Sequence, residues 1–132
     1  MMSKKLIVIE DDVASTMLLK RYLRRANWAP DVITFEYGSD ASAYFVDEAD
    51  SNAVVLLDLN LPDMHGIDVL KIIRQQFPSM HVVVLTTSNL DHERNACLEL
   101  GVDYFLEKPF NFERLITLME DLDVSFPSAR AS

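Results

Sequence analysis

The chain has 132 residues, with 21 acidic side chains against 12 basic ones and a formal net charge of -9 at pH 7. This length fits one domain, and 49% hydrophobic residues with only three glycines and five prolines exclude a disordered or collagen-like chain. The acidic excess argues against direct binding to nucleic acid or anionic lipid, because clustered basic residues normally hold such partners.

The cysteine content and the N-terminal sequence bear on the compartment. Cys97 is the only cysteine, which excludes an intramolecular disulfide and a cysteine-based zinc site and favours a reducing environment. The apolar run at residues 6–9 is too short for a signal peptide or a membrane helix. We therefore expect a soluble, cytoplasmic protein that does not insert into a membrane.

Three short runs are apolar at consecutive positions, which is typical of strands buried on both faces of a parallel sheet. Two weaker strands are predicted between and after them. In chain order the predicted strands are residues 6–9, 32–35, 53–57, 82–85 and 104–106.

Segments with helical spacing follow each predicted strand. They span residues 14–26, 39–48, 67–77, 91–100 and 111–122, with Asp91 and Asn111 as candidate N-caps and Gly101 as a helix stop. The apolar stripe predicted for the first helix contains Met17, Leu18, Tyr22 and Leu23, and that of the second contains Ala43, Tyr44 and Val46.

The strict alternation of strands and helices defines the expected fold class. It predicts an α/β domain with a doubly wound five-stranded parallel sheet, a flavodoxin-like (βα)5 three-layer sandwich. We expect the domain to span residues 4–124, and residues 125–132 to form a flexible tail or the start of a linker.

Polar residues follow the predicted strands, where such sheets place their functional groups. They are Glu10, Asp11 and Asp12 after the first strand, Asp58 after the third, Thr86 and Thr87 after the fourth, and Lys108 after the fifth. Converging carboxylates repel one another unless a cation joins them, and Mg²⁺ takes one or two carboxylates together with phosphate oxygens. A carboxylate can also attack phosphorus, with metal, ammonium and hydroxyl groups stabilising the transferred phosphoryl group. Asp58, Mg²⁺, Lys108 and Thr86 supply that set.

Four motifs occur in order at these strand ends. They are Ile9-Glu10-Asp11, the segment from Asp58 to Gly66, Leu85-Thr86-Thr87, and Glu107-Lys108-Pro109-Phe110. Together they resemble the receiver domains of two-component response regulators, over residues 4–122.

The resemblance implies an acceptor and a metal site. Asp58 matches the phospho-accepting nucleophile. For Mg²⁺ it implies Asp11 as direct ligand, Glu10 acting through water, Asp58 itself, and the backbone carbonyl of Asn60. Because Asp12 follows directly, it could join or replace a member of the acidic pair.

The resemblance also implies a switch. Lys108 matches the residue that pairs with the phosphoryl group, and Pro109 matches a cis proline. Thr86 and Thr87 compete for the switch hydroxyl, and Thr86 is favoured because it comes first after the apolar run. Phe105 then takes the position of the rotating aromatic residue.

The implied function is a phosphorylation switch that receives its phosphoryl group from a sensor histidine kinase or a histidine phosphotransfer protein and acts on a downstream protein target. It is not an enzyme beyond assisting its own phosphoryl transfer and dephosphorylation. One alternative is a receiver separated from a longer regulator or hybrid kinase. A Mg²⁺-dependent phosphohydrolase is disfavoured, because no inserted segment could build a substrate pocket. The acidic last helix favours a monomer or weak dimer.

Two groups of residues lie outside these motifs. His65, His81 and His92 share no spacing and are expected on the surface, whereas Cys97 is expected in the core. The basic residues of the first helix, Lys20, Arg21, Arg24 and Arg25, are expected to form a solvated face.

Overall fold

The computed structural model describes residues 5–47, 52–87, 90–108, 111–124, 126 and 128. The strands are β1 (Lys5–Ile9), β2 (Asp31–Phe35), β3 (Ala53–Asp58), β4 (His81–Thr86) and β5 (Tyr104–Glu107). The helices are α1 (Val13–Arg25), α2 (Gly38–Asp47), α3 (Gly66–Gln76), α4 (Asp91–Glu99) and α5 (Phe112–Asp121). Every boundary lies within one residue of the predicted one, and the expected fold class is confirmed.

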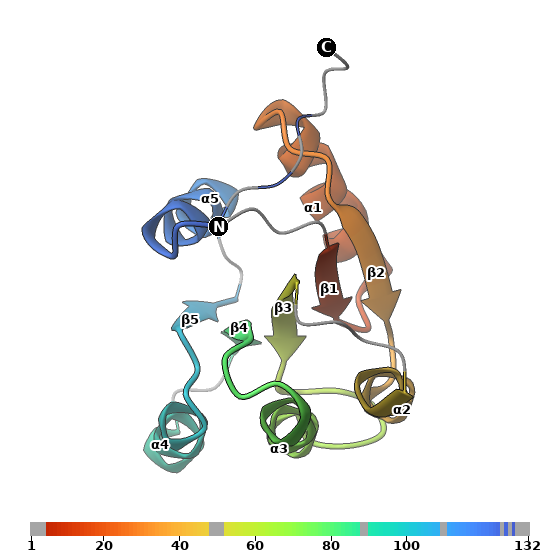
Figure 1. Cartoon of the computed structure of the whole chain (residues 1–132), viewed down its shortest axis with the longest axis vertical. Helices are drawn as coiled ribbons and strands as arrows, with labels where there is room; N and C mark the ends of the chain where they lie inside the picture. The colour runs from red at the N-terminus through yellow and green to blue at the C-terminus, as the bar shows by residue number, and fades with distance from the viewer. Residues whose placement is uncertain are drawn as a thin grey trace.

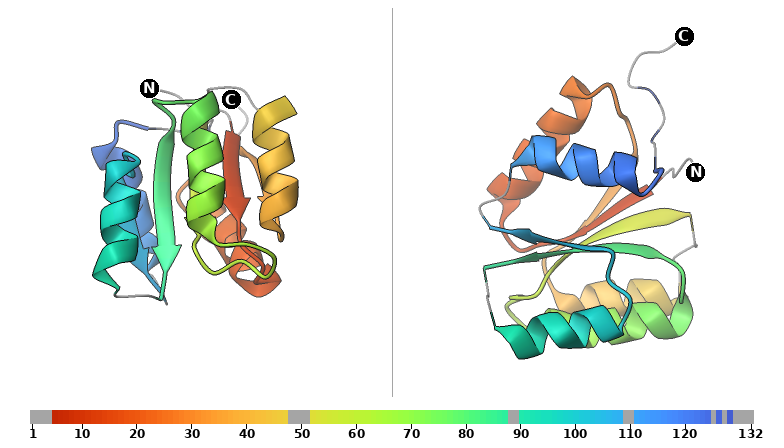
Figure 2. Two further views of the ribbon diagram at one scale, coloured as in Figure 1. Left: turned by 90° about the horizontal axis from the view of Figure 1, so that it is seen from below. Right: turned by 90° about the vertical axis from the view of Figure 1, so that its left-hand side faces the viewer.

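The sheet is parallel throughout, with strand order β2-β1-β3-β4-β5. Helices α1 and α5 cover one face, and α2, α3 and α4 cover the other (Figures 1 and 2). The strand order changes direction between β1 and β3, so the carboxyl ends of these two strands flank the topological switch point. In open α/β sheets this is where binding sites form.

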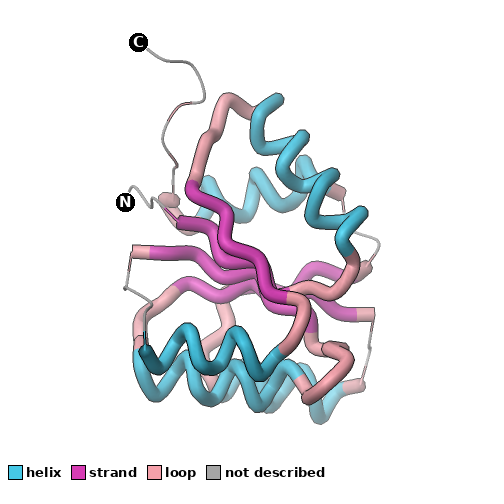
Figure 3. The backbone as a smooth tube through the Cα atoms, turned by 90° about the vertical axis from the view of Figure 1, so that its right-hand side faces the viewer, coloured by secondary structure: helices cyan, strands magenta, loops and turns pink. Residues whose placement is uncertain are grey.

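The core is built from strands that are buried on both faces, as their continuous apolar runs predict. All six residues of β3 are buried. Helices lie on both sides of the sheet (Figure 3). Alternate side chains of β3 enter two apolar layers: Val55 and Leu57 pack with α2, α3 and α4, whereas Val54 and Leu56 pack with α1 and α5. Because the strands are packed into the core, the point at which each strand leaves the sheet is fixed. The positions of the polar residues that follow are fixed with it.

The apolar stripe predicted for the first helix is wrong in part. Met17 is 67% exposed and Leu18 is 42% exposed. The buried residues of α1 are Thr16, Leu19 and Leu23, spaced three and four apart so that they share the face on the sheet. Met17 and Leu18 therefore lie outside the face that packs on the sheet.

A similar correction applies to α2. Val46 is 56% exposed and Ala43 is exposed, whereas Ala41 and Phe45, one turn apart, are buried. The period is helical in both cases. What the pattern did not determine is which of several apolar faces turns toward the sheet.

The helix ends agree with the sequence at two of three positions. Asn111 caps α5 by accepting a hydrogen bond from the Glu113 N–H (2.8 Å), and Gly101 adopts φ +74 just after α4. Asp91 is not an N-cap, because Leu90 holds that position and Asp91 is the first helical residue. An acidic side chain in the first turn still favours the helix through its dipole.

The segment after α5 returns to the domain at its described positions. Val124 and Phe126 are buried, and the Phe126 ring meets the Trp28 ring edge-on at 5.5 Å between centroids. An antiparallel bridge joins Trp28 to Ser128. The packed domain therefore extends past residue 124 to these two positions, which the sequence placed in a tail. Among the described residues, no helix is long and apolar enough to cross a membrane.

The loop between β3 and α3 is fixed to α2 by Asp63. Its carboxylate accepts hydrogen bonds from the N–H groups of Gly38 (2.7 Å) and Ser39 (2.9 Å), at the N-terminus of α2. The bond from Ser39, reinforced by the one from Gly38, holds the pKa of Asp63 below its ordinary value of 3.8.

We predict that Asp63→Asn lowers the melting temperature at pH 7. Because the folded pKa of Asp63 is depressed, its carboxylate stabilises the fold above pH 3.8, and this contribution disappears as the pH falls through the lower folded pKa. The difference from the wild type should therefore shrink in acid, as thermal unfolding across a pH series will show. Asp68→Asn, an exposed acid 4.0 Å from Lys71, is the control and should change little. Equal melting temperatures at neutral pH would contradict the role of Asp63.

Gly66 permits the close approach between α3 and the end of β3. A Cβ atom there would lie 2.5 Å from the Asp58 carbonyl oxygen and 2.6 Å from the Leu59 Cα. We predict that Gly66→Ala destabilises the fold by on the order of 1–3 kcal/mol, because backbone atoms must shift. Chemical denaturation measures this. At Gly38 the nearest atoms belong to the Met64 side chain, which can rotate, so Gly38→Ala should cost less; the reverse order would refute the argument.

Candidate functional site

The two strands at the switch point each deliver a buried carboxylate. Glu10 directly follows β1 and is 4% exposed, and Asp58 is the last residue of β3 and is 3% exposed. Ile9 and Leu57 are paired across the sheet, so the two acids leave it at neighbouring positions.

A third acid completes a cluster. Glu10, Asp11 and Asp58 each offer a carboxylate oxygen, and these oxygens lie within 4.8 Å of one another. The Asp12 side chain instead caps α1, where it accepts hydrogen bonds from the Ala14 N–H (3.1 Å) and the Ser15 hydroxyl (2.7 Å). The structure thus groups Glu10 and Asp11, rather than Asp12, with Asp58.

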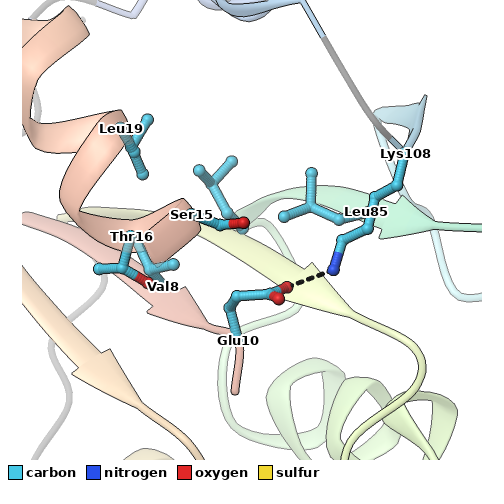
Figure 4. A pocket seen from close by; sticks show the side chains of 8 residues that line it. Val8, Glu10, Ser15, Thr16, Leu19, Leu85 and Lys108 are labelled. Atoms are coloured by element: carbon cyan, nitrogen blue, oxygen red, sulfur yellow. Dashed lines mark hydrogen bonds and ion pairs between the residues drawn. The ribbon is translucent and has the colours of Figure 1, made fainter. Parts of the chain in front are cut away.

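Lys108 links the two buried acids. Its ammonium donates to Glu10 Oε2 (2.6 Å) and to Asp58 Oδ2 (2.9 Å). Figure 4 shows the Glu10 contact at the edge of a small pocket between the sheet and α1, which Val8, Thr16 and Leu85 help to line. The Lys108 N–H also donates to the Thr86 carbonyl oxygen (2.9 Å), which fixes the chain just after β5.

Burial shifts the pKa values of the ionisable groups at this site, because little water is present to solvate their charges. Burial raises the pKa of Glu10 to about 7, Lys108 opposes this change, and the neighbouring Asp58 adds to it. Burial also disfavours the charge on Lys108, but the hydrogen bonds with Glu10 and Asp58 outweigh it and raise the pKa of the ammonium. With Asp11 included, three acids face one ammonium, so the site attracts a further cation.

The loop after β3 orients the Asp58 carboxylate. Asp58 Oδ1 accepts a hydrogen bond from the Asn60 N–H (2.9 Å), and the Asn60 amide donates to the Thr87 hydroxyl (3.4 Å). An open hollow on the surface is lined by Asp11 and residues 59–65. A phosphoryl donor could therefore reach the acid cluster from this side.

The two candidate hydroxyls lie in different places. Thr86 is the last residue of β4 and is 2% exposed, whereas Thr87 is exposed and contacts Asn60. Strand alternation puts Thr86 on the same face as Val84, which is the face on which Phe105 packs. Thr86 and Phe105 thus lie on the side of the sheet covered by α3 and α4. Pro109, the predicted cis proline, lies outside the described residues.

Sequence reasoning missed two side chains beside this group. Arg94 of α4 lies over the Phe105 ring, 4.8 Å from its centroid. His65 is half-buried and contacts Glu93, and His81 is half-buried beside Asp103, so the expected surface placement holds only for His92. Histidine is not among the usual N-cap residues, so its place before Gly66 carried no signal.

The donor set suits a hard divalent cation. All three clustered groups are carboxylates. Mg²⁺ prefers oxygen ligands and usually binds only one or two protein carboxylates directly. The same site holds a carboxylate capable of nucleophilic attack on phosphorus and an ammonium capable of stabilising phosphoryl oxygens. The residues present therefore fit metal-assisted phosphoryl transfer to a carboxylate.

Comparison with known proteins agrees with this chemistry. The family model for the response regulator receiver domain matches residues 6–120. The Bacillus subtilis alkaline phosphatase synthesis transcriptional regulatory protein PhoP is 34% identical over 83% of this chain and 44% of its own length. The chain spans about half or less of the first curated relatives that it matches.

Solved structures give the same result. A response regulator receiver domain from Rhodospirillum rubrum is 32% identical, with a TM-score of 0.74 over 96% of this chain and 99% of that one. The BeF3-activated receiver domain of DrrB is 29% identical, with a TM-score of 0.73 over 90% of this chain and 96% of that one. The chain belongs to the response regulator receiver domain family and is a phosphorylation-dependent switch of the two-component type.

Proposed function

We propose that Asp58 is the residue that accepts the phosphoryl group. One observation carries this assignment: Asp58 is a buried carboxylate at the switch point, oriented by the Asn60 N–H and Lys108 and clustered with two further acids. The other clustered acids lack this combination, because Asp11 is exposed and Glu10 is not held by the loop after β3.

The proposed reaction is a direct transfer from a phosphohistidine. A carboxylate oxygen of Asp58 forms a bond to phosphorus while the bond between phosphorus and the donor's imidazole nitrogen breaks. The imidazole leaves with the electron pair and takes up a proton from solution, and Asp58 becomes an acyl phosphate. Attack by water on phosphorus later restores the carboxylate and releases inorganic phosphate. The chain thus assists its own phosphorylation and dephosphorylation without turning over a separate substrate.

We assign the Mg²⁺ site to Asp11 as direct ligand, Glu10 through water, the Asp58 carboxylate and the Asn60 backbone carbonyl. When bound, the ion supplies positive charge that offsets the repulsion between the acids and the incoming phosphoryl oxygens. The grouping of Glu10, Asp11 and Asp58 supports this set, and the capping role of Asp12 argues against its membership.

We assign the switch to Lys108, Thr86 and Phe105. Phosphorylation draws the Lys108 ammonium toward the new phosphoryl oxygens, so its contact with Glu10 must weaken. The Thr86 hydroxyl turns toward the phosphoryl group, and Phe105 moves into the space it leaves. The placement of Thr86 and Phe105 on the same face of the sheet, with Arg94 of α4 over the Phe105 ring, supports this sequence of movements. Pro109 is proposed as the cis proline that follows Lys108.

The proposed donor is a sensor histidine kinase or a histidine phosphotransfer protein, and the proposed readout is an altered contact with a downstream protein, without direct nucleic-acid binding by this domain. We place the protein in the cytoplasm, where ATP-dependent kinases act, as a monomer or weak dimer.

The longer curated relatives favour a second possibility, that this receiver forms part of a larger regulator.

We predict that Asp58→Asn abolishes phosphorylation by acetyl phosphate with Mg²⁺, because the neutral amide removes the nucleophile while keeping its shape. Intact-mass spectrometry with an alkaline hydrolysis step detects the acyl phosphate. Asp12→Asn is the matched control: asparagine also caps helices, so this variant should be phosphorylated at close to the wild-type rate. A base-labile adduct forming on Asp58→Asn at the wild-type rate would refute the assignment.

Lys108→Ala should separate metal binding from phosphoryl transfer. The ammonium competes with a cation for Glu10 and Asp58, so calorimetry should show Mg²⁺ affinity that is unchanged or higher. Phosphorylation by acetyl phosphate should slow roughly 100-fold, because a charge that stabilises the phosphoryl oxygens is lost. Loss of Mg²⁺ binding in this variant would contradict the proposed role, as would an unchanged phosphorylation rate.

A further inference from the structure

His65 closes the loop that follows the phosphoacceptor Asp58; this loop, residues 59–65, is called the acceptor loop. It pairs with Asn60 in an isolated antiparallel bridge, and the following Gly66 N–H donates to the Leu59 carbonyl oxygen (2.8 Å). Asn60 in turn donates its N–H to Asp58. A movement of the Asp58 carboxylate is therefore connected through short backbone contacts to His65.

The two nitrogens of the His65 ring serve different partners. Nδ1 accepts a hydrogen bond from the Ile67 N–H (3.1 Å), which caps α3. A nitrogen that accepts carries no proton, so the ring proton resides on Nε2. Nε2 lies 3.0 Å from Glu93 Oε1 of α4 and is therefore the donor in that contact. The Glu93 side chain is only 15% exposed, so water screens this bond weakly.

The position of α4 depends heavily on such contacts. Cys97 is the only buried residue of α4, whereas α3 buries Val69, Leu70 and Ile73 together with Gly66. Adjacent residues of α4 contact two different elements: Glu93 contacts His65 in the loop after β3, and Arg94 contacts Phe105 of the proposed switch. An element with little apolar anchoring can be shifted by the gain or loss of one polar contact.

We propose that the hydrogen bond between His65 and Glu93 couples the acceptor loop to α4 and stabilises the unphosphorylated conformation of the domain. In the structure Lys108 contacts both Glu10 and Asp58, and the first of these contacts is the one that phosphorylation is proposed to weaken. His65 is a positioning residue in this scheme, and the inference rests on the proposed role of Asp58. Because coupling is reciprocal, loss of the bond makes phosphorylation-like ligands bind more tightly.

The variants separate coupling from capping. His65→Asn retains a good N-cap for α3, but its side chain is too short to reach Glu93. Glu93→Ala removes the acceptor and leaves His65 intact. The matched control is His81→Asn, which removes a second histidine-carboxylate contact (His81 Nδ1 to Asp103 Oδ1, 3.4 Å) at the opposite end of β4 from Thr86.

The experiment titrates each protein with BeF3⁻ in the presence of Mg²⁺ and follows binding by NMR. His65→Asn and Glu93→Ala should each bind about threefold to tenfold more tightly than the wild type, and the double variant should gain no more than either alone. His81→Asn should match the wild type. Wild-type affinity in both single variants, or gains that multiply in the double variant, would overturn the proposal.

Hydrogen exchange without BeF3⁻ distinguishes failure of this inference from failure of the proposed function. The α4 amides should exchange faster in His65→Asn and Glu93→Ala than in the wild type, whether or not the wild type binds BeF3⁻. Faster exchange with no BeF3⁻ binding by any protein would overturn the phosphoacceptor role and leave the contact in place. Unchanged α4 exchange in both variants would overturn the coupling itself.

Discussion

The structure depends on the burial of two carboxylates beside one ammonium. Glu10 and Asp58 lie at the ends of two core strands and are both buried, so Lys108 offsets charge that burial makes unfavourable. The offset is incomplete, since Asp11 adds a third acid and burial still raises the pKa of Glu10 to about 7. A site left short of positive charge is suited to gaining a cation, and an ammonium shared by two acids is suited to being drawn away by a phosphoryl group.

The fold supplies the rigidity that this arrangement requires. Parallel strands buried on both faces end at heights set by core packing, and the Gly66 contact holds α3 directly against the backbone of Asp58 and Leu59. Asp63 ties the same loop to α2 through charge-assisted hydrogen bonds. The acceptor loop is thus held on two sides, by α2 and by α3.

Sequence predicted those features that depend on local rules. Continuous apolar runs and the acids directly after them located the strands and the Glu10, Asp11 and Asp58 group, because a parallel sheet collects its strand ends at one edge. The predictions fail for features that depend on tertiary contacts. Met17 and Leu18 are as apolar as Leu19, and only the sheet selects which face of α1 is buried. The contact of His65 with Glu93 joins residues from two separate parts of the chain, and the identity of neither residue predicts this contact.

The helices differ in the number of residues that they bury in the core, and we expect this difference to determine which helix moves most easily. On one face of the sheet, α3 buries four residues and α4 buries one. Displacing α4 exposes less apolar surface and therefore requires less free energy. The weakly held helix is also the one whose neighbouring residues Glu93 and Arg94 contact the acceptor loop and Phe105. Under the proposed coupling, a change at Asp58 is therefore expected to displace α4 more readily than α3, which has more buried residues.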